Sequence, residues 1–455
     1  MGSKNPIKQR THRSRAEGLV RPENLRVVGE GFDGRIVLLD PDGPDWFYVS
    51  PSLAAFICLW DNRGQNRDLL QLFKIDEGQP GKEDPVPTIL QELLRIGLLQ
   101  KKINPGPDRE PAPRGEPTTV SVYLTRRCNL SCRYCFYDAG RSGEKELDTG
   151  QALQLLDQIA ALGVKRVNFM GGEPLLREDL FLLAGRARER GLEVNLITNG
   201  TLITPDVARK IKEHFPLLQV SLDGLEAEHD FVRGAGGFDR ALQGIKNLLD
   251  EEIPFAVSCI ISRINRERVG EFMEFLISLG VPYFHCVNLQ AHGRGACHQD
   301  MTLSFGRYIE TLFQLYKKYH GPIAINQFAQ LLNIKPGVRK DNCGAGELMV
   351  EIDADGKVYP CYKFMSPPYA AGDVRCSGLA EIYRDSPVLR RLGRATIEIT
   401  PDCLLCDVRY FCGGGCLAER LQGNDKNQCE EKKTFWHWVL LNTREGQWLG
   451  QDFTL

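Results

Sequence analysis

The spacing of the cysteines constrains this chain more than any other feature of its sequence. Ten of the fifteen cysteines fall into two groups, one from Cys128 to Cys135 and one from Cys343 to Cys429. Thiols stay reduced in a cytosolic chain, so clustered cysteines there bind metal or take part in catalysis more often than they form disulfides. We therefore expect both groups to bind metal.

The first group is the motif C-x3-C-x2-C, formed by Cys128, Cys132 and Cys135. Three thiolates on one tight loop can bind three irons of a [4Fe–4S] cube and leave the fourth iron without a protein ligand. Zinc is the alternative, but it needs a fourth Cys or His close by, and the loop has none. The motif therefore predicts a cubic cluster with one iron open to chemistry.

This motif follows the first of six short β-rich segments that alternate with helical ones. The β-rich segments are TVSVYLT, RVNFM, EVNLIT, LLQVSLD, FAVSCII and YFHCVNL. Alternating strands and helices predict a parallel sheet, and right-handed crossovers curl such a sheet towards a barrel. We expect an α/β fold with a partial (β/α)6 TIM-like barrel, whose functional loops lie at the C-terminal ends of the strands.

The cysteine motif, with Tyr134 before its last cysteine, resembles the radical SAM superfamily. The resemblance implies that the open iron binds S-adenosylmethionine and that one electron cleaves it to a 5′-deoxyadenosyl radical. The motifs GGEP, TNG and SLDG follow successive predicted strands. By the resemblance, the GGEP backbone meets the methionine amino group, Glu173 fixes that loop, and Arg233 lies near the carboxylate. The implied cofactor-binding residues are Tyr134, Gly171, Gly172, Glu173, Pro174, Thr198, Asn199, Ser221, Asp223 and Arg233.

The second cysteine group is similar, across its full length, to the SPASM extension of radical SAM enzymes that modify peptides and proteins. Structural zinc is the alternative, but seven cysteines behind a radical SAM motif fit it poorly. The resemblance implies two auxiliary clusters, and hence three [4Fe–4S] clusters in the chain. It assigns Cys403, Cys406, Cys412 and Cys429 to an outer cluster and Cys343, Cys361 and Cys416 to an inner one.

The inner cluster lacks an obvious fourth ligand. The sequence KPGVRKDN precedes Cys343, where family members that fully ligate this cluster place another cysteine. One interpretation is an open iron that binds a substrate thiolate. The other is that a distant residue, such as Cys286, Cys297 or Cys376, completes the cluster.

A few cysteines and histidines outside the two groups also need an interpretation. Cys58 and Cys259 lie in apolar runs, which favours small core residues over metal ligands. His292 and His298 occur in AHGRGACH and are further candidates for the active site, although no spacing argument supports them.

Composition along the chain divides it into five parts. Residues 1–20 are polar and basic and predict a flexible arm, and the proline-rich residues 104–117 predict a linker. Between them, residues 21–103 contain three β-rich segments and then three helical patterns, which predicts a winged-helix-like α+β domain. We expect the barrel at 118–320 and the SPASM domain at 321–455.

The N-terminal domain resembles the precursor-peptide recognition element through DGRIVLLDPD, VSPSLAAFICLW and ILQELLRIGLLQ. A DNA-binding winged helix is the alternative, but the predicted helices lack clustered Lys and Arg. The resemblance implies that a leader peptide binds as an added strand at the sheet edge. Such tethering raises the effective concentration of the core peptide at the barrel.

Together these resemblances predict a maturase of ribosomally synthesised peptides. The motifs CGAG and DGKVYPCYKF are similar to those of thioether-forming sactipeptide and ranthipeptide maturases. We expect a leader-bound, Cys-containing precursor peptide to lose hydrogen to the radical and to gain an intramolecular thioether, with a flavodoxin or ferredoxin as reductant. Carbon–carbon crosslinking, excision, epimerisation and sulfatase formylglycine formation use the same parts and are alternatives. A more distant alternative is a zinc-bearing winged-helix binding protein.

The composition also argues against two classes of binding partner, nucleic acids and membranes. The formal net charge is -2, with 25% charged and 42% hydrophobic residues, so no basic surplus predicts nucleic-acid binding. No apolar stretch is long enough for a membrane helix, and the N-terminus lacks the apolar segment of a secretory signal. We expect a cytoplasmic protein with no nucleic-acid or membrane partner.

Overall fold

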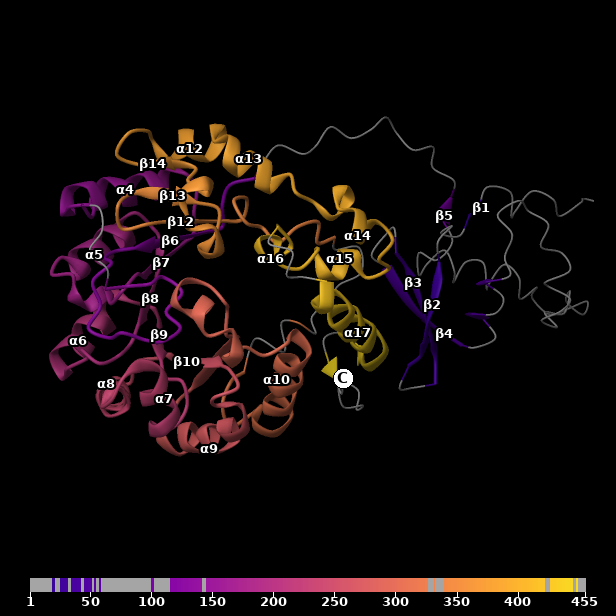
Figure 1. The fold of residues 1–455 in the computed structure, drawn as a ribbon, viewed down its shortest axis with the longest axis horizontal. Helices are drawn as coiled ribbons and strands as arrows, with labels where there is room; N and C mark the ends of the chain where they lie inside the picture. The colour runs from indigo at the N-terminus through magenta and orange to yellow at the C-terminus, as the bar shows by residue number, and fades with distance from the viewer. Residues whose placement is uncertain are drawn as a thin grey trace, which may run out of the picture.

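The computed structural model describes residues 19–20, 25–31, 34–41, 45–50, 53–54, 57–58, 100–101, 115–140, 145–325, 331, 339–421, 426–444 and 447–448. A curved array of strands and helices occupies one end of the molecule, and a small sheet occupies the other (Figure 1). The C-terminal segments lie between them.

Within the described residues, the central sheet has nine strands in the order β11-β10-β9-β8-β7-β6-β12-β13-β14. The first six in this order are parallel neighbours, as the alternating segments predict. They are β6 (Thr119–Tyr123), β7 (Arg166–Met170), β8 (Glu193–Thr198), β9 (Leu217–Ser221), β10 (Ala256–Ile261) and β11 (Tyr283–Asn288). They form the predicted partial barrel.

Helices cover the outer face of this sheet (Figure 1). They are α4 (Thr149–Ala161), α5 (Leu180–Glu189), α6 (Pro205–His214), α7 (Glu226–Arg233), α8 (Gly237–Asp250), α9 (Val269–Leu279) and α10 (Phe305–Tyr319). Local sequence sets where they begin. Before α4, Asp148 and Gln151 each accept the other's backbone N–H, which satisfies two amides that the helix leaves unpaired.

Alternation along the strands separates an apolar outer face from a polar inner face. Val120 of β6 and Val167 and Phe169 of β7 are fully buried in the core shared with the helices. Ser121 and Asn168, at the intervening positions, line a cavity inside the barrel. The sheet therefore has a packed exterior and a polar interior.

The C-terminal domain extends the same sheet. β12 (Met349–Ile352) pairs in parallel with β6, and β13 (Lys357–Tyr359) and β14 (Gly372–Asp373) follow it antiparallel. The helices here are α12 (Leu379–Asp385), α13 (Pro387–Gly393), α14 (Pro401–Leu404), α15 (Arg409–Cys412), α16 (Leu417–Leu421) and α17 (Lys426–Asn442). Apart from α17, these elements are too short to show a clear period in the sequence.

Short elements complete the described part of the chain. The 3-10 helices are η2 (Pro174–Leu176), η3 (Arg266–Arg268), η4 (Gly293–Cys297), η5 (Gln299–Met301), η6 (Tyr362–Phe364), η7 (Pro367–Tyr369) and η8 (Ile397–Ile399). A hairpin of β15 (Thr443–Arg444) and β16 (Gln447–Trp448) follows α17. None of the helices in the described ranges combines the length and hydropathy that a bilayer crossing requires.

The N-terminal sheet contains β2 (Arg26–Glu30), β3 (Ile36–Asp40) and β4 (Asp45–Val49), antiparallel and in that order. All three strands occur where the sequence predicts them. Residues 53–54 and 57–58 are helical, whereas the later predicted helices and most of the predicted linker lie outside the described residues. β1 (Leu19–Val20) pairs with β5 (Gln100–Lys101), so the predicted flexible arm ends in a strand, which a distant partner stabilises.

This N-terminal sheet packs against the C-terminal domain beside α15 and α17 (Figure 1). The Tyr48 hydroxyl donates a hydrogen bond to the Leu440 carbonyl at 2.8 Å. The rings of Trp46 and Phe411 meet edge to face, with centroids 5.6 Å apart. The sheet is therefore anchored next to Cys412.

Candidate active site

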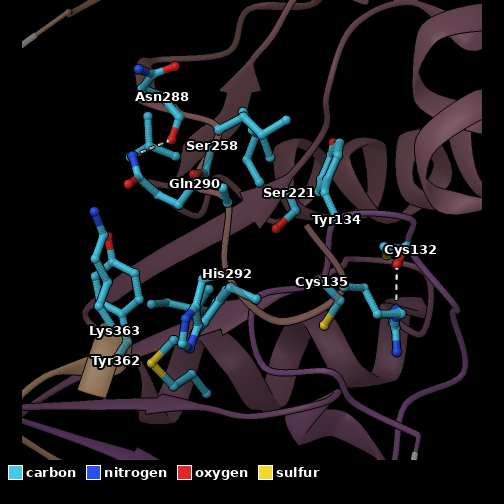
Figure 2. Close-up of a pocket in the computed structure, with 18 of the residues that line it drawn as sticks. Cys132, Tyr134, Cys135, Ser221, Ser258, Asn288, Gln290, His292, Tyr362 and Lys363 are labelled. Atoms are coloured by element: carbon cyan, nitrogen blue, oxygen red, sulfur yellow. Dashed lines mark hydrogen bonds between the residues drawn. The ribbon is translucent and has the colours of Figure 1, made fainter. Parts of the chain in front are cut away.

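A cavity of about 1080 Å³ lies inside the barrel, and it extends to the C-terminal ends of the parallel strands. Figure 2 shows Cys132 and Tyr134 on one side of it and Tyr362 and Lys363, from the C-terminal domain, on the other. The predicted site residues that line it are Cys128, Cys132, Tyr134, Cys135, Gly171, Gly172, Thr198, Asn199, Ser221, Arg233 and Cys416.

The loop that follows β6, which we call the thiol loop (residues 124–140), places Cys128, Cys132 and Cys135 on the cavity. Burial, with smaller contributions from the negative charges of Glu173, Cys132 and Cys135, raises the pKa of the Cys128 thiol to about 11. Burial also raises the pKa of Cys132, which the nearby Arg233 opposes. Bound iron removes this cost because thiolates bind it directly. Three such thiols facing one cavity fit a cluster with an open iron.

The GGEP segment packs directly against the thiol loop. Gly172 N–H donates to the Thr125 carbonyl at 2.7 Å, and Glu173 N–H donates to the Arg127 carbonyl at 2.8 Å. A Cβ on Gly172 would lie 2.1 Å from the Arg127 oxygen, and one on Gly171, whose φ is +138°, would lie 2.5 Å from the Thr125 oxygen. These positions need glycine because two backbones are in contact there.

Glu173 and Pro174 lie behind the cavity wall rather than on it. The buried Glu173 carboxylate accepts hydrogen bonds from the Thr198 hydroxyl at 2.7 Å and from the Asn199 N–H at 2.8 Å. Burial raises the pKa of Glu173, and these donors oppose that shift. The Asn199 side chain in turn donates to Asn129 of the thiol loop at 2.9 Å. Glu173 therefore ties the ends of β7 and β8 to the thiol loop.

Asp223, just after β9, connects the end of β10 to the thiol loop. Its carboxylate accepts from the Tyr134 hydroxyl at 2.5 Å and from Ile260 N–H at 2.7 Å, and it forms an ion pair with Arg233. Burial alone would raise the pKa of Asp223, but Arg233 and His229 hold it below its usual value. Asp223 is buried beneath the cavity, whereas Arg233 lines it. The ion pair thus fixes a guanidinium where an anionic group of a ligand can meet it.

A second glycine-containing segment holds the other side of the thiol loop. Arg294 N–H donates to the Cys135 carbonyl at 2.9 Å, and the Arg294 side chain donates to the Cys132 carbonyl at 2.8 Å and the Ala139 carbonyl at 2.7 Å. Gly293 has φ +57°, and a Cβ there would lie 2.3 Å from the Phe136 oxygen. In this segment His292 and His298 were predicted from the sequence, whereas Gly293 and Arg294 were not. The sequence signal that could have identified them is an arginine between two glycines, Gly293-Arg294-Gly295.

The other histidines and cysteines that the sequence offered as site residues lie in different environments. His292 lines the cavity, whereas His298 and Cys297 are not among its lining residues, and Cys297 is exposed. Cys286 is buried in the core, with its sulfur 4.0 Å from the Tyr308 hydroxyl, and Cys376 is exposed. Among the described residues, no three His, Cys, Asp or Glu side chains converge as the ligands of one metal ion would.

Six of the seven C-terminal cysteines lie in two groups. The inner thiols, Cys343, Cys361 and Cys416, pack together in one small cluster of buried side chains. Burial raises the pKa of Cys361 to about 12, and the charges of the other two inner thiols add to that shift. The outer thiols, Cys403, Cys406 and Cys412, lie near one another around α14 and α15, and Cys429 lies exposed on α17.

Of the inner thiols, Cys416 lines the same cavity as the thiol loop. Beside it, Lys363 donates to the Glu419 carboxylate at 2.5 Å, and both side chains line the cavity. The sequence analysis did not single out this pair. It gives the wall next to Cys416 a fixed, charge-balanced surface.

Comparison with known proteins defines the class. Residues 122–276 match the radical SAM superfamily, and residues 343–407 match SPASM, an iron–sulfur cluster-binding domain. The chain is 31% identical over 324 residues to an AdoMet-dependent heme synthase of Methanosarcina barkeri, a match that covers 66% of this chain and 91% of that protein. It is 30% identical over 312 residues to the mycofactocin maturase MftC of Mycolicibacterium smegmatis, covering 67% of this chain and 79% of that protein. The chain therefore belongs to the radical SAM superfamily, as an enzyme with a SPASM domain.

Solved structures share its fold. Streptococcus suis SuiB bound to the precursor peptide SuiA superposes with a TM-score of 0.58 at 16% identity, covering 89% of this chain and 95% of that one. The anSMEcpe structure with bound AdoMet and Cp18Cys peptide superposes with a TM-score of 0.58 at 19% identity, covering 72% and 98%. These likenesses confirm the predicted partial barrel.

Proposed function

We propose that this enzyme matures ribosomally synthesised peptides by forming intramolecular thioethers between a Cys sulfur and carbon. The supporting observation is the shared cavity, which the thiol loop lines on one side and Cys416 on the other. Thioether formation needs a radical-forming centre and a thiolate-binding centre that face one substrate. The proposal includes three [4Fe–4S] clusters, held by the thiol loop, by the inner thiols, and by the outer thiols with Cys429.

The chemistry follows from this arrangement. When bound, S-adenosylmethionine and the first cluster supply a 5′-deoxyadenosyl radical, which takes one hydrogen atom from a peptide carbon. The C–H and S–H bonds of the peptide break, and one C–S bond forms. The thiol proton goes to solvent, and clusters held by the inner and outer thiols would accept the remaining electron. Arg233 holds the carboxylate of the sulfonium compound, and the closely packed glycine segments keep the thiol loop in place.

The N-terminal sheet is the proposed site for the leader of the precursor peptide. Within the described residues β4 pairs only with β3, so its other edge is available to an added strand. The relatives support a peptide substrate, because MftC is named a maturase and SuiB binds SuiA. We place the enzyme in the cytoplasm, with a flavodoxin or ferredoxin as reductant.

A tetrapyrrole-modifying activity is the second candidate, favoured by the 31% identity to a heme synthase. Against it, the N-terminal sheet, the proposed leader site, is packed onto the C-terminal domain. Carbon–carbon crosslinking, excision, epimerisation and formylglycine formation are variants of the peptide proposal.

Anaerobic co-expression with candidate precursors, sought as small cysteine-rich reading frames near this gene, tests the proposal. A thioether removes one pair of hydrogen atoms and makes one cysteine resistant to iodoacetamide. We expect both changes together. A mass loss with all cysteines still alkylated would point to carbon–carbon crosslinking, and an unmodified peptide with turnover of an added iron porphyrin would support the tetrapyrrole candidate.

A further inference from the structure

The interior of the cavity, below the motif loops, has a polar surface that none of the motifs explains. Six inward-facing residues on β6, β7, β9, β10, β11 and β12 form it, and we call them the cavity floor. They are Ser121, Asn168, Gln219, Ser258, His285 and Glu351. A barrel interior that served only for packing would be apolar, so this surface indicates a ligand.

Two buried polar atoms of this region have no hydrogen-bond partner in the described structure. One is Oε2 of Glu351, which lies opposite Ser121 in the parallel pairing of β12 with β6. The other is the hydroxyl of Tyr123, two residues further along β6. The two residues are 5% and 1% exposed, and both line the cavity. A buried polar atom without a partner is unfavourable, so a ligand group is expected to satisfy both.

The electrostatics of the floor favour a neutral ligand group. Burial raises the pKa of Glu351 to about 8, and the nearby Ser121 hydroxyl opposes this only in part. Burial lowers the pKa of His285, so its imidazole is held neutral. The Lys363 ammonium at the other wall is already paired with Glu419. No unbalanced cation or anion among these groups would attract a charged ligand.

We propose that Glu351 and Tyr123 form a substrate subsite that holds a hydroxyl or carboxamide group of the peptide residue that reacts. This inference rests on the proposed peptide substrate and names the class of residue that it presents. The subsite fixes that residue, so that one of its carbons faces the ligands bound at the thiol loop. Asn168 on the adjacent strand β7, and Gln219 further round the floor on β9, supply further donors and acceptors of the same kind.

The test uses full-length, cluster-reconstituted enzyme and the cysteine-containing precursor peptide that the co-expression experiment identifies. The readout is the amount of crosslinked peptide formed per 5′-deoxyadenosine, together with KM for the peptide. In E351Q and Y123F we expect this ratio to fall about tenfold and KM to rise, because the reacting residue is no longer held. Y123F keeps the test decisive if E351Q does not fold.

The matched control is E228Q. Glu228 is also buried, with an oxygen that lacks a partner, but it lies on α7 outside the cavity. E228Q should keep the ratio and KM of the unaltered enzyme. Unchanged ratios in both E351Q and Y123F, with an active unaltered enzyme, would overturn the subsite and leave the maturase proposal intact. No modification of the peptide by the unaltered enzyme would overturn the maturase proposal itself.

Discussion

The cavity has two walls that are built in different ways. On the barrel side, three thiols lie within one short loop, and backbone hydrogen bonds from the segments at Gly172 and Arg294 hold that loop. On the C-terminal side, Cys343, Cys361 and Cys416 come from separate segments that pack into one small cluster. The barrel wall therefore depends on close backbone contact, whereas the C-terminal wall depends on how distant segments assemble. The two should respond differently to substitution.

Removing the thiols of each wall in turn should give the largest contrast. We expect alanines at Cys128, Cys132 and Cys135 to abolish 5′-deoxyadenosine formation and to lower iron from about twelve to about eight per chain. Alanines at the three inner thiols should remove a similar amount of iron and stop crosslinking, while 5′-deoxyadenosine still forms. Iron analysis and chromatography of the nucleoside measure both effects. Loss of the nucleoside in both triple variants alike would contradict the division of roles.

Gly172→Ala tests the close backbone contact of the barrel wall. Its Cβ would lie 2.1 Å from the Arg127 oxygen, so the thiol loop has to move. We expect 5′-deoxyadenosine formation to fall about a hundredfold, the usual effect of a displacement of about 1 Å at a reacting site.

The matched control is Gly185→Ala on α5, where a Cβ would have no neighbour within 4 Å. This change should leave the rate unaltered and stabilise the protein by about 0.5–1 kcal/mol, because alanine favours the helix. If both variants kept full activity, the GGEP backbone would not be positioning the thiol loop.

Arg294→Lys should have a smaller effect on the same loop. A lysine replaces the two donor nitrogens that contact the carbonyls of Cys132 and Ala139 with a single ammonium on a flexible stem, so the loop loosens. We expect iron at the thiol loop to be held about tenfold more weakly, with a shifted reduction potential in spectroscopic titration. Arg263→Lys, whose side chain donates to one exposed carbonyl at Thr302, is the control and should change neither quantity.

Trp46→Ala should have the smallest effect, because it changes neither wall. The variant loses the ring contact with Phe411 that anchors the N-terminal sheet, a loss of about 1 kcal/mol. Limited proteolysis should release the N-terminal sheet sooner in this variant than in Val27→Ala, whose side chain is already 55% exposed. Equal cleavage of the two would show that the sheet is held by other contacts.

The contrast between ligands that are adjacent in the chain and ligands from separate segments also explains which features the sequence could predict. The barrel strands were predictable, because each alternates or continues in apolar residues between helical segments, as RVNFM and EVNLIT do. The first cysteine motif was predictable because its ligands are adjacent in the chain. Family resemblance supplied the division of the later cysteines, which spacing alone could not give.

Contacts between distant segments were beyond sequence reasoning. Glu351 faces the cavity only because β12 pairs in parallel with β6, far away in the chain. Arg294 matters because its side chain reaches carbonyls of the thiol loop. The strands β12, β13 and β14 are too short for a two-residue period to stand out. The remaining N-terminal helices are predictions that lie outside the described residues.

The most direct measurement follows hydrogen from the peptide to the nucleoside. Reconstituted enzyme is reduced anaerobically with S-adenosylmethionine and a fully deuterated precursor peptide, and the 5′-deoxyadenosine is analysed by mass spectrometry. The account predicts one deuterium in the nucleoside and a thioether in the peptide. Unlabelled nucleoside beside an unchanged peptide would contradict it.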